Sequence, residues 1–139
     1  MKKYDLIAIG TGSAMTIVQA YLGTQPASRI AIIDKDPPGG ICLTKGCVPT
    51  KMLVYPAELI RLMGEAHDLG IKFGISRIDF KKIMKRMHTS VDKEIRQIGK
   101  SLKQARNIDY FQDVARFKAP YQLTVGGRTI TSDNILLCL

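Results

Sequence analysis

The stretch YDLIAIGTGSAM, residues 4–15, decides the fold. Tyr4–Gly10 is apolar and rich in β-formers, which is typical of a strand buried on both faces of a parallel sheet. Gly10 and Gly12 enclose a tight turn, and Ala14–Leu22 has the pattern of a helix. A strand, a glycine turn and a helix in this order predict the first unit of an α/β fold.

The same turn has the composition of a nucleotide phosphate site. Glycines at 10 and 12 let the backbone approach a pyrophosphate at the N-terminus of the following helix. A second buried strand, Arg29–Asp34, ends in an acid 24 residues after Gly10, where a carboxylate can accept hydrogen bonds from a ribose. Met15 occupies the place of the third glycine of the G-x-G-x-x-G pattern. A dinucleotide that contains ADP is favoured over a glycine turn without a ligand.

Helices dominate the middle of the chain. Cys42–Leu53 and Ala57–Leu69 are predicted to be helical, with Pro49 and Pro56 bending or interrupting the run. Lys81–Arg106 is predicted to be one long helix because its apolar residues recur every three or four positions. This stripe comprises Met84, Met87, Val91, Ile95, Ile98, Leu102 and Ala105.

The last third of the chain changes to short β-rich segments punctuated by Pro120 and by Gly126 and Gly127. The pattern predicts a small β-meander followed by a final apolar strand. The predicted strands are Tyr110–Phe117, Tyr121–Val125, Thr129–Thr131 and Ile135–Leu139.

Composition limits the class of protein. The chain has 139 residues, of which 45% are hydrophobic, enough for one domain with a real core. No run of 18 apolar residues predicts a membrane span. The net charge of +9 raises the possibility of a nucleic-acid partner, but much of it lies in Lys81–Arg106, opposite the apolar stripe. That arrangement favours a helix face that is exposed to solvent or packs on a partner subunit. We therefore expect no nucleic-acid partner.

Two of the three cysteines lie five residues apart in GGICLTKGCVPTK, residues 39–51. A zinc site is a poor explanation, because structural zinc needs four ligands and Cys138, His67 and His88 are not paired by spacing; we expect no metal. A purely structural disulfide would close a very short loop and remove little entropy from the unfolded chain. The absence of a signal-peptide pattern and the few cysteines predict a cytoplasmic protein.

A working disulfide between Cys42 and Cys47 makes a geometric demand. Residues five apart in a straight helix have Cα atoms about 8.6 Å apart, whereas a disulfide needs them within about 7 Å. A helix that carried both would therefore be distorted in its first turns, which Gly46 and Pro49 permit. Lys51 lies one helical turn after Cys47, and its charge and a helix N-terminus would both favour a thiolate at Cys47.

These residues resemble a known family. GGICLTKGCVPTK is similar to the active-site motif of the class I pyridine nucleotide–disulfide oxidoreductases, among them dihydrolipoamide dehydrogenase, mercuric reductase and glutathione reductase. YDLIAIGTGSAM and Asp34 resemble the FAD fingerprint of the family, and residues 113–139 resemble its meander. The resemblance implies an α/β, Rossmann-like FAD-binding domain with a parallel sheet, helices and a small β-meander. Residues 1–139 would be the N-terminal part of that domain, without the NAD(P) and dimerisation domains.

The resemblance also implies roles for individual residues. Cys47 would be the sulfur on the flavin side, Cys42 the sulfur that exchanges with substrate, and Lys51 a neighbour of the flavin. The remaining residues implied to bind FAD are Gly10, Gly12 and Ser13 at the pyrophosphate, Asp34 and Lys35 at the adenosine side, Gly39 and Gly40 along the cofactor, and Ala115, whose backbone would approach the adenine.

The implied activity is a disulfide oxidoreductase. NAD(P)H would reduce FAD, FAD would open the Cys42–Cys47 disulfide, and the dithiol would reduce its substrate, with the steps reversed in dihydrolipoamide dehydrogenases. The implied partners are a small-molecule disulfide, a dithiol or a lipoyl-type substrate, and a second subunit in a homodimer. This chain alone is not expected to turn over. A non-catalytic module that binds a flavin or nucleotide remains the alternative, with a basic nucleic-acid binder as a third class.

Overall fold

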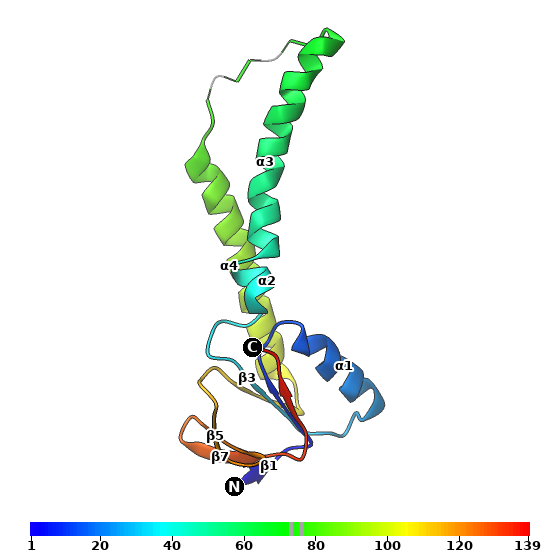
Figure 1. Ribbon diagram of the computed structural model, residues 1–139, viewed down its shortest axis with the longest axis vertical. Helices are drawn as coiled ribbons and strands as arrows, with labels where there is room; N and C mark the ends of the chain where they lie inside the picture. Colours follow the sequence, from blue (N-terminus) through cyan, green and yellow to red (C-terminus); the bar gives the residue numbers. More distant parts are fainter. Residues whose placement is uncertain (73, 76) are drawn as a thin grey trace.

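The structure, a computed structural model, describes residues 1–72, 74–75 and 77–139. It contains two four-stranded sheets and a long helical arm (Figure 1). The helices are α1 (Ala14–Thr24), α2 (Gly40–Thr44), α3 (Cys47–Glu65), the short 3-10 helix η1 (Ala66–Leu69) and α4 (Phe80–Gln104). The strands are β1 (Lys2–Lys3), β2 (Leu6–Ile9), β3 (Ile30–Ile33), β4 (Ile108–Phe111), β5 (Arg116–Ala119), β6 (Gln122–Val125), β7 (Arg128–Thr131) and β8 (Ile135–Leu137).

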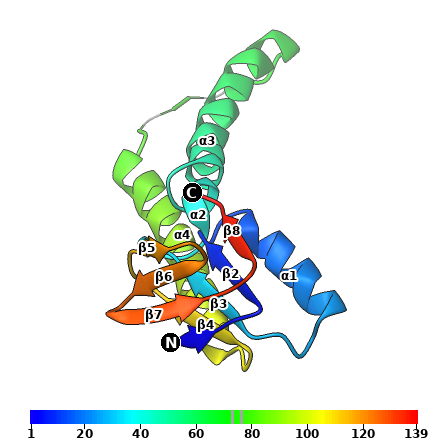
Figure 2. The same ribbon diagram turned by 60° about the horizontal axis from the view of Figure 1, so that its bottom comes forward.

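A parallel sheet in the order β4-β3-β2-β8 forms the centre of the fold (Figure 2). Its two middle strands, β2 and β3, are buried throughout. Both are continuous apolar runs because each face of the sheet is covered, one by helices and the other by the second sheet. This arrangement confirms the predicted α/β, Rossmann-like fold.

The second sheet, in the order β1-β7-β6-β5, is the predicted meander with one addition. Strands β5, β6 and β7 pair antiparallel, and the two-residue β1 joins β7 in parallel. Its buried side chains, Leu123, Val125 and Ile130, pack on one face of the parallel sheet. The opposite face packs against Val18 of α1 and Leu102 of α4.

The single strand predicted over Tyr110–Phe117 is wrong. The segment divides into β4, which belongs to the parallel sheet, and β5, which belongs to the meander. The chain turns between them at Asp113, whose carboxylate accepts a hydrogen bond from the backbone N–H of Val114. Both parts have β-forming residues, so local composition does not reveal that the chain changes sheets there.

The predicted pair of helices between residues 42 and 69 also needs correction. The interruption lies between the two cysteines, after α2, and α3 then runs through Pro49 and Pro56 as one helix. Pro49 is third in α3, where a backbone N–H would have no partner within the helix. Pro56 lies inside the helix without ending it.

The long basic helix is confirmed as α4, and its apolar stripe faces inward, with Met87, Val91 and Leu102 buried. Helices α3 and α4 pack together and extend away from the sheets as an arm (Figure 1). Arg86 of α4 donates a hydrogen bond of 3.1 Å to the carbonyl oxygen of Met52 in α3. Within the described ranges, no helix combines the length and hydrophobicity needed to cross a membrane.

Candidate redox and nucleotide site

The glycine turn lies at the carboxyl ends of the parallel strands β2 and β3. Gly10 directly follows β2, has φ +110°, and donates its backbone N–H to the carbonyl oxygen of Ile33 at 2.8 Å. A Cβ added at Gly10 would lie 2.0 Å from the carbonyl oxygen of Cys138, beyond β8. The packing of the sheet therefore requires glycine here, in addition to any approach of a ligand.

Gly12 brings the nucleotide turn against the cysteine motif. Gly40, the first residue of α2, has φ +67°, and a Cβ there would lie only 2.5 Å from the Cα of Gly12. Two glycines that are 28 residues apart in sequence are thus in backbone contact. Because neither carries a side chain, α2 begins directly on the glycine turn, and the two sequence motifs form one site.

Thr11 ties the turn to the acid at the end of β3. Its backbone N–H and its hydroxyl both donate to Oδ2 of Asp34, at 2.8 and 2.5 Å. The same hydroxyl accepts a hydrogen bond from the backbone N–H of Gly39 at 3.1 Å, and Oδ1 of Asp34 accepts from Asp36 N–H. Thr11 is 3% exposed, and it is not among the site residues predicted from the sequence. A hydroxyl between two glycines, directly after an apolar strand, was the available signal.

The N-terminus of α1 has unused hydrogen-bond donors. In the part of the chain that the structure describes, the backbone N–H groups of Gly12 and Ser13 have no partner, the Ser13 side chain does not cap the helix, and the first turn has no acid. Lys35 is exposed just beyond Asp34. Free N–H groups at a helix N-terminus attract a diphosphate. The residues present therefore fit the pyrophosphate of a dinucleotide cofactor.

The side chain of Tyr110, in β4, places a hydroxyl group near the carboxyl ends of the parallel strands. Its buried hydroxyl has no hydrogen-bond partner among the described residues. Burial, and then the charge of Asp34, raise the pKa of the Tyr110 phenol. Nothing in the sequence marks this residue as part of a site, because a tyrosine in a strand is ordinary core composition.

The two cysteines face each other across the break between α2 and α3. Cys42 lies in α2, and Cys47 is the first residue of α3. A Cβ added at Gly46 would lie 3.2 Å from the Cα of Cys42 and 3.0 Å from the carbonyl oxygen of Ile41. The backbone is thus tightly packed at Gly46, in the break between α2 and α3, which is the helix distortion that the cysteine spacing predicted. Both cysteines are exposed free thiols.

The Cys42 side chain influences the ionisation of Cys47. Cys42 raises the pKa of Cys47, first through hydrogen bonding and then through its charge, while Lys51 acts in the lowering direction. The pKa of Cys47 is therefore raised, whereas the sequence predicted a lowered pKa and a stabilised thiolate at this residue. The prediction counted Lys51 and the helix N-terminus, but it did not count the neighbouring sulfur, whose hydrogen bond and charge both raise the pKa of Cys47.

The remaining predicted site residues are more dispersed. Lys35 and Lys51 are exposed, and Ala115 packs against the core between the sheets. Two surface pockets, of about 300 and 590 Å³, lie at β4 and beside Pro37 and Pro38, and are lined by neither the glycine turn nor the cysteines. Within residues 1–72, 74–75 and 77–139, no three His, Cys, Asp or Glu side chains gather as metal ligands do.

Comparison with known proteins gives a consistent set of relatives. The chain is 32% identical to the dihydrolipoyl dehydrogenase of Mycoplasma genitalium, over 96% of its length and 29% of that protein. It is 32% identical to the mycothione reductase of Mycobacterium tuberculosis, over 99% of its length and 30% of that protein. It is 28% identical to the glutathione reductase of Nostoc sp., over 98% of its length and 29% of that protein.

A solved structure supports the same relationship. The Cu(II) complex of the HOCl-induced flavoprotein disulfide reductase RclA from Escherichia coli superposes with a TM-score of 0.77 at 26% identity, covering 99% of this chain and 29% of that one. No family model matches the chain. The chain spans about 29% of the length of the curated relatives it matches. The sequence relatives and the solved structure point to the same family over nearly the whole chain. The chain belongs to the class I pyridine nucleotide–disulfide oxidoreductase family.

Proposed function

We propose that this chain binds FAD across the glycine turn and the cysteine motif, as part of the FAD-binding domain of a disulfide oxidoreductase. The observation that carries the proposal is the backbone contact between Gly12 and Gly40. This contact joins a helix N-terminus with free N–H donors to the helix that presents Cys42. A diphosphate held at one end would leave the rest of an extended cofactor running toward the sulfurs.

Each part of the site has a role toward that cofactor. The N–H groups of Gly12 and Ser13 would hold the pyrophosphate beside Gly10, and Asp34 with Lys35 would bind the adenosine side. Thr11 orients the Asp34 carboxylate for this task. Gly39 and Gly40 would lie along the cofactor, Ala115 near the adenine and Lys51 near the flavin. FAD, when bound, supplies two-electron redox chemistry that these side chains lack.

The cysteine pair performs its own half of the reaction. When the two thiols form a disulfide, an S–S bond replaces two S–H bonds, and two electrons and two protons leave. The pKa of Cys47 is raised, with Cys42 as the largest cause, which acts against a stabilised thiolate at Cys47. We assign substrate exchange to Cys42, on the short α2 helix, and the flavin side to Cys47. The tight return at Gly46 keeps both sulfurs within reach of each other.

For the whole protein we propose a dihydrolipoamide dehydrogenase-like activity with a small-molecule dithiol or disulfide as substrate. Relatives named for dihydrolipoyl, glutathione and mycothione substrates support that class. Exchange of electrons with NAD(P) and assembly as a homodimer would involve parts that this chain does not contain, so the chain alone would not turn over. We place the protein in the cytoplasm.

FAD binding is the direct test. The purified chain is refolded with FAD, desalted, and its flavin absorbance is measured per mole of protein. We expect bound flavin in the wild type and much less in Gly12→Asp, whose carboxylate would occupy the phosphate site and repel the diphosphate. Gly64→Asp, at an exposed and open position of α3, makes the same change of charge and is the matched control.

The alternative, a non-catalytic nucleotide-binding module, predicts a different result. Such a protein would stay colourless with FAD but would bind ADP, as measured by calorimetry. Binding of neither ligand by a correctly folded chain would refute both proposals. Formation of an intramolecular disulfide in oxidised glutathione, detected by mass spectrometry and lost in Cys47→Ser, tests the redox half separately.

A further inference from the structure

Strand β4 forms the open edge of the parallel sheet, on the side opposite β8. The carbonyl oxygens of Asn107 and Phe111 accept hydrogen bonds from Ile30 and Asp34 of the β3 segment, at 2.9 and 3.0 Å. Because alternate residues of a parallel strand bond to opposite sides, the main chains of Ile108 and Tyr110 point away from β3. They offer N–H and C=O groups to a further strand.

A groove of about 300 Å³ runs along this edge. All four residues of β4 line it. One wall is Lys103 in the last turn of α4, and the other consists of Lys2, Arg128 and Ile130 from β1 and β7. Figure 2 shows β4 beside β3, with β1 and β7 next to it on the meander side.

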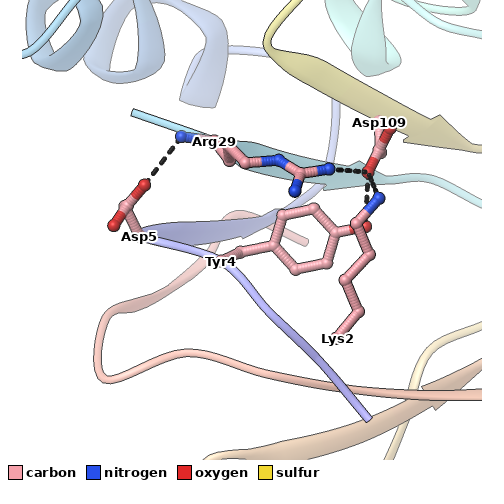
Figure 3. A network of polar contacts seen from close by, with 5 residues as sticks. All are labelled: Lys2, Tyr4, Asp5, Arg29 and Asp109. Atoms are coloured by element: carbon pink, nitrogen blue, oxygen red, sulfur yellow. Dashed lines mark hydrogen bonds and ion pairs between the residues drawn. The ribbon is translucent and has the colours of Figure 1, made fainter. Parts of the chain in front are cut away.

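The groove is positively charged. Its one acid, Asp109, is occupied, since its Oδ2 accepts from Lys2 Nζ at 2.5 Å and from the Tyr4 hydroxyl at 2.6 Å. Arg29 lies 4.0 Å from the same oxygen (Figure 3). Within the described ranges, Lys103 and Arg128 have no carboxylate partner. Each wall of the groove therefore has one cationic side chain without a carboxylate partner among the described residues, Lys103 on one wall and Arg128 on the other.

We propose that this groove binds an extended acidic segment of a partner protein, which adds to β4 as an outer strand. The partner's backbone would pair with the main chains of Ile108 and Tyr110. Successive side chains of a strand point to opposite faces, so two adjacent acids would reach Lys103 on one wall and Arg128 on the other. The partner motif is thus a pair of neighbouring Glu or Asp residues flanked by β-formers.

Charge argues against a second copy of this chain as the occupant. Pairing two β4 edges would bring the Lys103 and Arg128 side chains of both copies together, in a chain that already carries a net charge of +9. Lysines beside an edge strand also discourage such self-pairing. An acidic strand meets the same cations with the opposite sign.

The test uses a fluorescein-labelled Thr-Val-Glu-Glu-Val-Thr peptide, with blocked ends, and the full chain. Binding is followed by fluorescence anisotropy and by the backbone amide NMR signals of Ile108 and Tyr110. We expect the peptide to bind and to shift both signals, and the double variant Lys103→Glu/Arg128→Glu to weaken binding at least about tenfold through charge reversal. Lys93→Glu, exposed elsewhere on α4, should bind as the wild type does.

Two further peptides separate backbone pairing from charge attraction. Replacing both glutamates by lysine should abolish binding, and N-methylation of alternate amides should weaken it strongly because strand pairing is blocked. Equal binding of the N-methylated peptide, or of the lysine peptide, would overturn the proposal. So would failure of the glutamate peptide to bind at low salt, or dimerisation of the chain through this edge. None of these readouts depends on FAD.

Discussion

Thr11 links three parts of the site through one buried hydroxyl. It donates to Asp34 at the end of β3 and accepts from Gly39 at the start of the cysteine motif. The ends of β2 and β3 and the loop before α2 thus share one polar atom. Leaving such buried groups without partners costs more than the bonds themselves contribute.

Thr11→Val keeps the shape of the side chain but removes the hydroxyl. The Gly39 N–H then lacks its acceptor and Asp34 loses one donor, so we expect the free energy of unfolding to fall by about 1–3 kcal/mol. Urea denaturation measures this change. Thr11→Ser retains the hydroxyl and should lose clearly less; equal stability of the valine variant and the wild type would contradict the role.

The ionisation of Cys47 can be tested in the same way. Cys42 raises the pKa of Cys47 and Lys51 acts against it, so Cys42→Ala should lower that pKa and increase the thiolate fraction near neutral pH. The measurement is the pH dependence of iodoacetamide alkylation at Cys47, followed by peptide mass spectrometry under reducing conditions. Lys51→Met should shift the profile in the opposite direction. An unchanged profile in Cys42→Ala would show that the sulfurs do not interact.

At the scale of elements, two glycines determine where α2 begins and ends. Gly40 starts the helix in contact with Gly12, and Gly46 packs against the backbone of Ile41 and Cys42 just before α3. The short helix is therefore held at both ends by backbone contacts that allow no side chain. Its position decides both the reach of Cys42 toward Cys47 and the distance of the pair from the nucleotide turn.

Gly40→Ala should displace α2 from the glycine turn. Its added Cβ would lie 2.5 Å from Gly12 Cα, whereas Gly127, with a similar φ of +70°, has nothing within 4 Å of its Cβ position. Both variants carry the conformational penalty of a positive φ, about 1 kcal/mol, but Gly40→Ala alone adds a clash. We expect Gly40→Ala to lose FAD binding and Gly127→Ala to keep it, as measured by flavin absorbance. Equal binding by both would refute the contact.

Gly46→Ala should weaken the cysteine pairing. The new methyl group presses on the backbone of Cys42, at 3.2 Å from its Cα, and separates the two sulfurs. We expect the disulfide to be several-fold less stable against glutathione, because strained disulfides are easier to reduce. Mass spectrometry of samples equilibrated in glutathione buffers gives the ratio. Gly64→Ala, at an open position of α3, should leave the ratio unchanged.

At the scale of the whole molecule, the two ends of the parallel sheet have different tasks. The candidate site lies at the carboxyl ends of β2 and β3. At the amino ends, Lys2, Tyr4 and Arg29 converge on Asp109 of β4 (Figure 3). This network fastens the N-terminus of the chain and the edge strand to the core, far from the chemistry.

The network makes stability depend on pH. Hydrogen bonds from Lys2 and Tyr4 lower the pKa of Asp109 below its ordinary 3.8. A lowered carboxyl pKa adds stability above the unfolded-state pKa, and this gain disappears as the pH falls through the folded-state value. We expect Asp109→Asn to be less stable than the wild type at pH 7, with a smaller difference at a pH well below 3.8. Urea denaturation at both pH values measures it; a difference that persists in acid would contradict the ionic origin.

Local patterns were sufficient for much of this fold. The buried strands β2 and β3, the glycine turn and the striped α4 follow from apolar runs and from helical periodicity, which neighbouring residues set. The cysteine spacing likewise predicted a distorted backbone near Gly46. These features depend on short-range sterics and on burial of one continuous face.

The boundaries that sequence analysis misplaced depend on distant partners. Residues 110–117 read as one strand because both halves are β-forming, but their partners lie in different sheets. The helix interruption was assigned to Pro49 and Pro56, whereas packing placed it between the cysteines. Local propensity carries no information about which remote segment a residue will meet.

The sequence by itself determined the family, the α/β class of the fold and the backbone distortion between the cysteines, because these depend on residue type and short spacing. Only the tertiary structure decided that Gly12 touches Gly40, that Thr11 holds Asp34, and that Cys42 raises the pKa of Cys47. Most of these contacts join segments more than 20 residues apart, and the two cysteines lie on either side of the break between α2 and α3. They exist only once the sheet has brought the carboxyl ends of its strands to one edge.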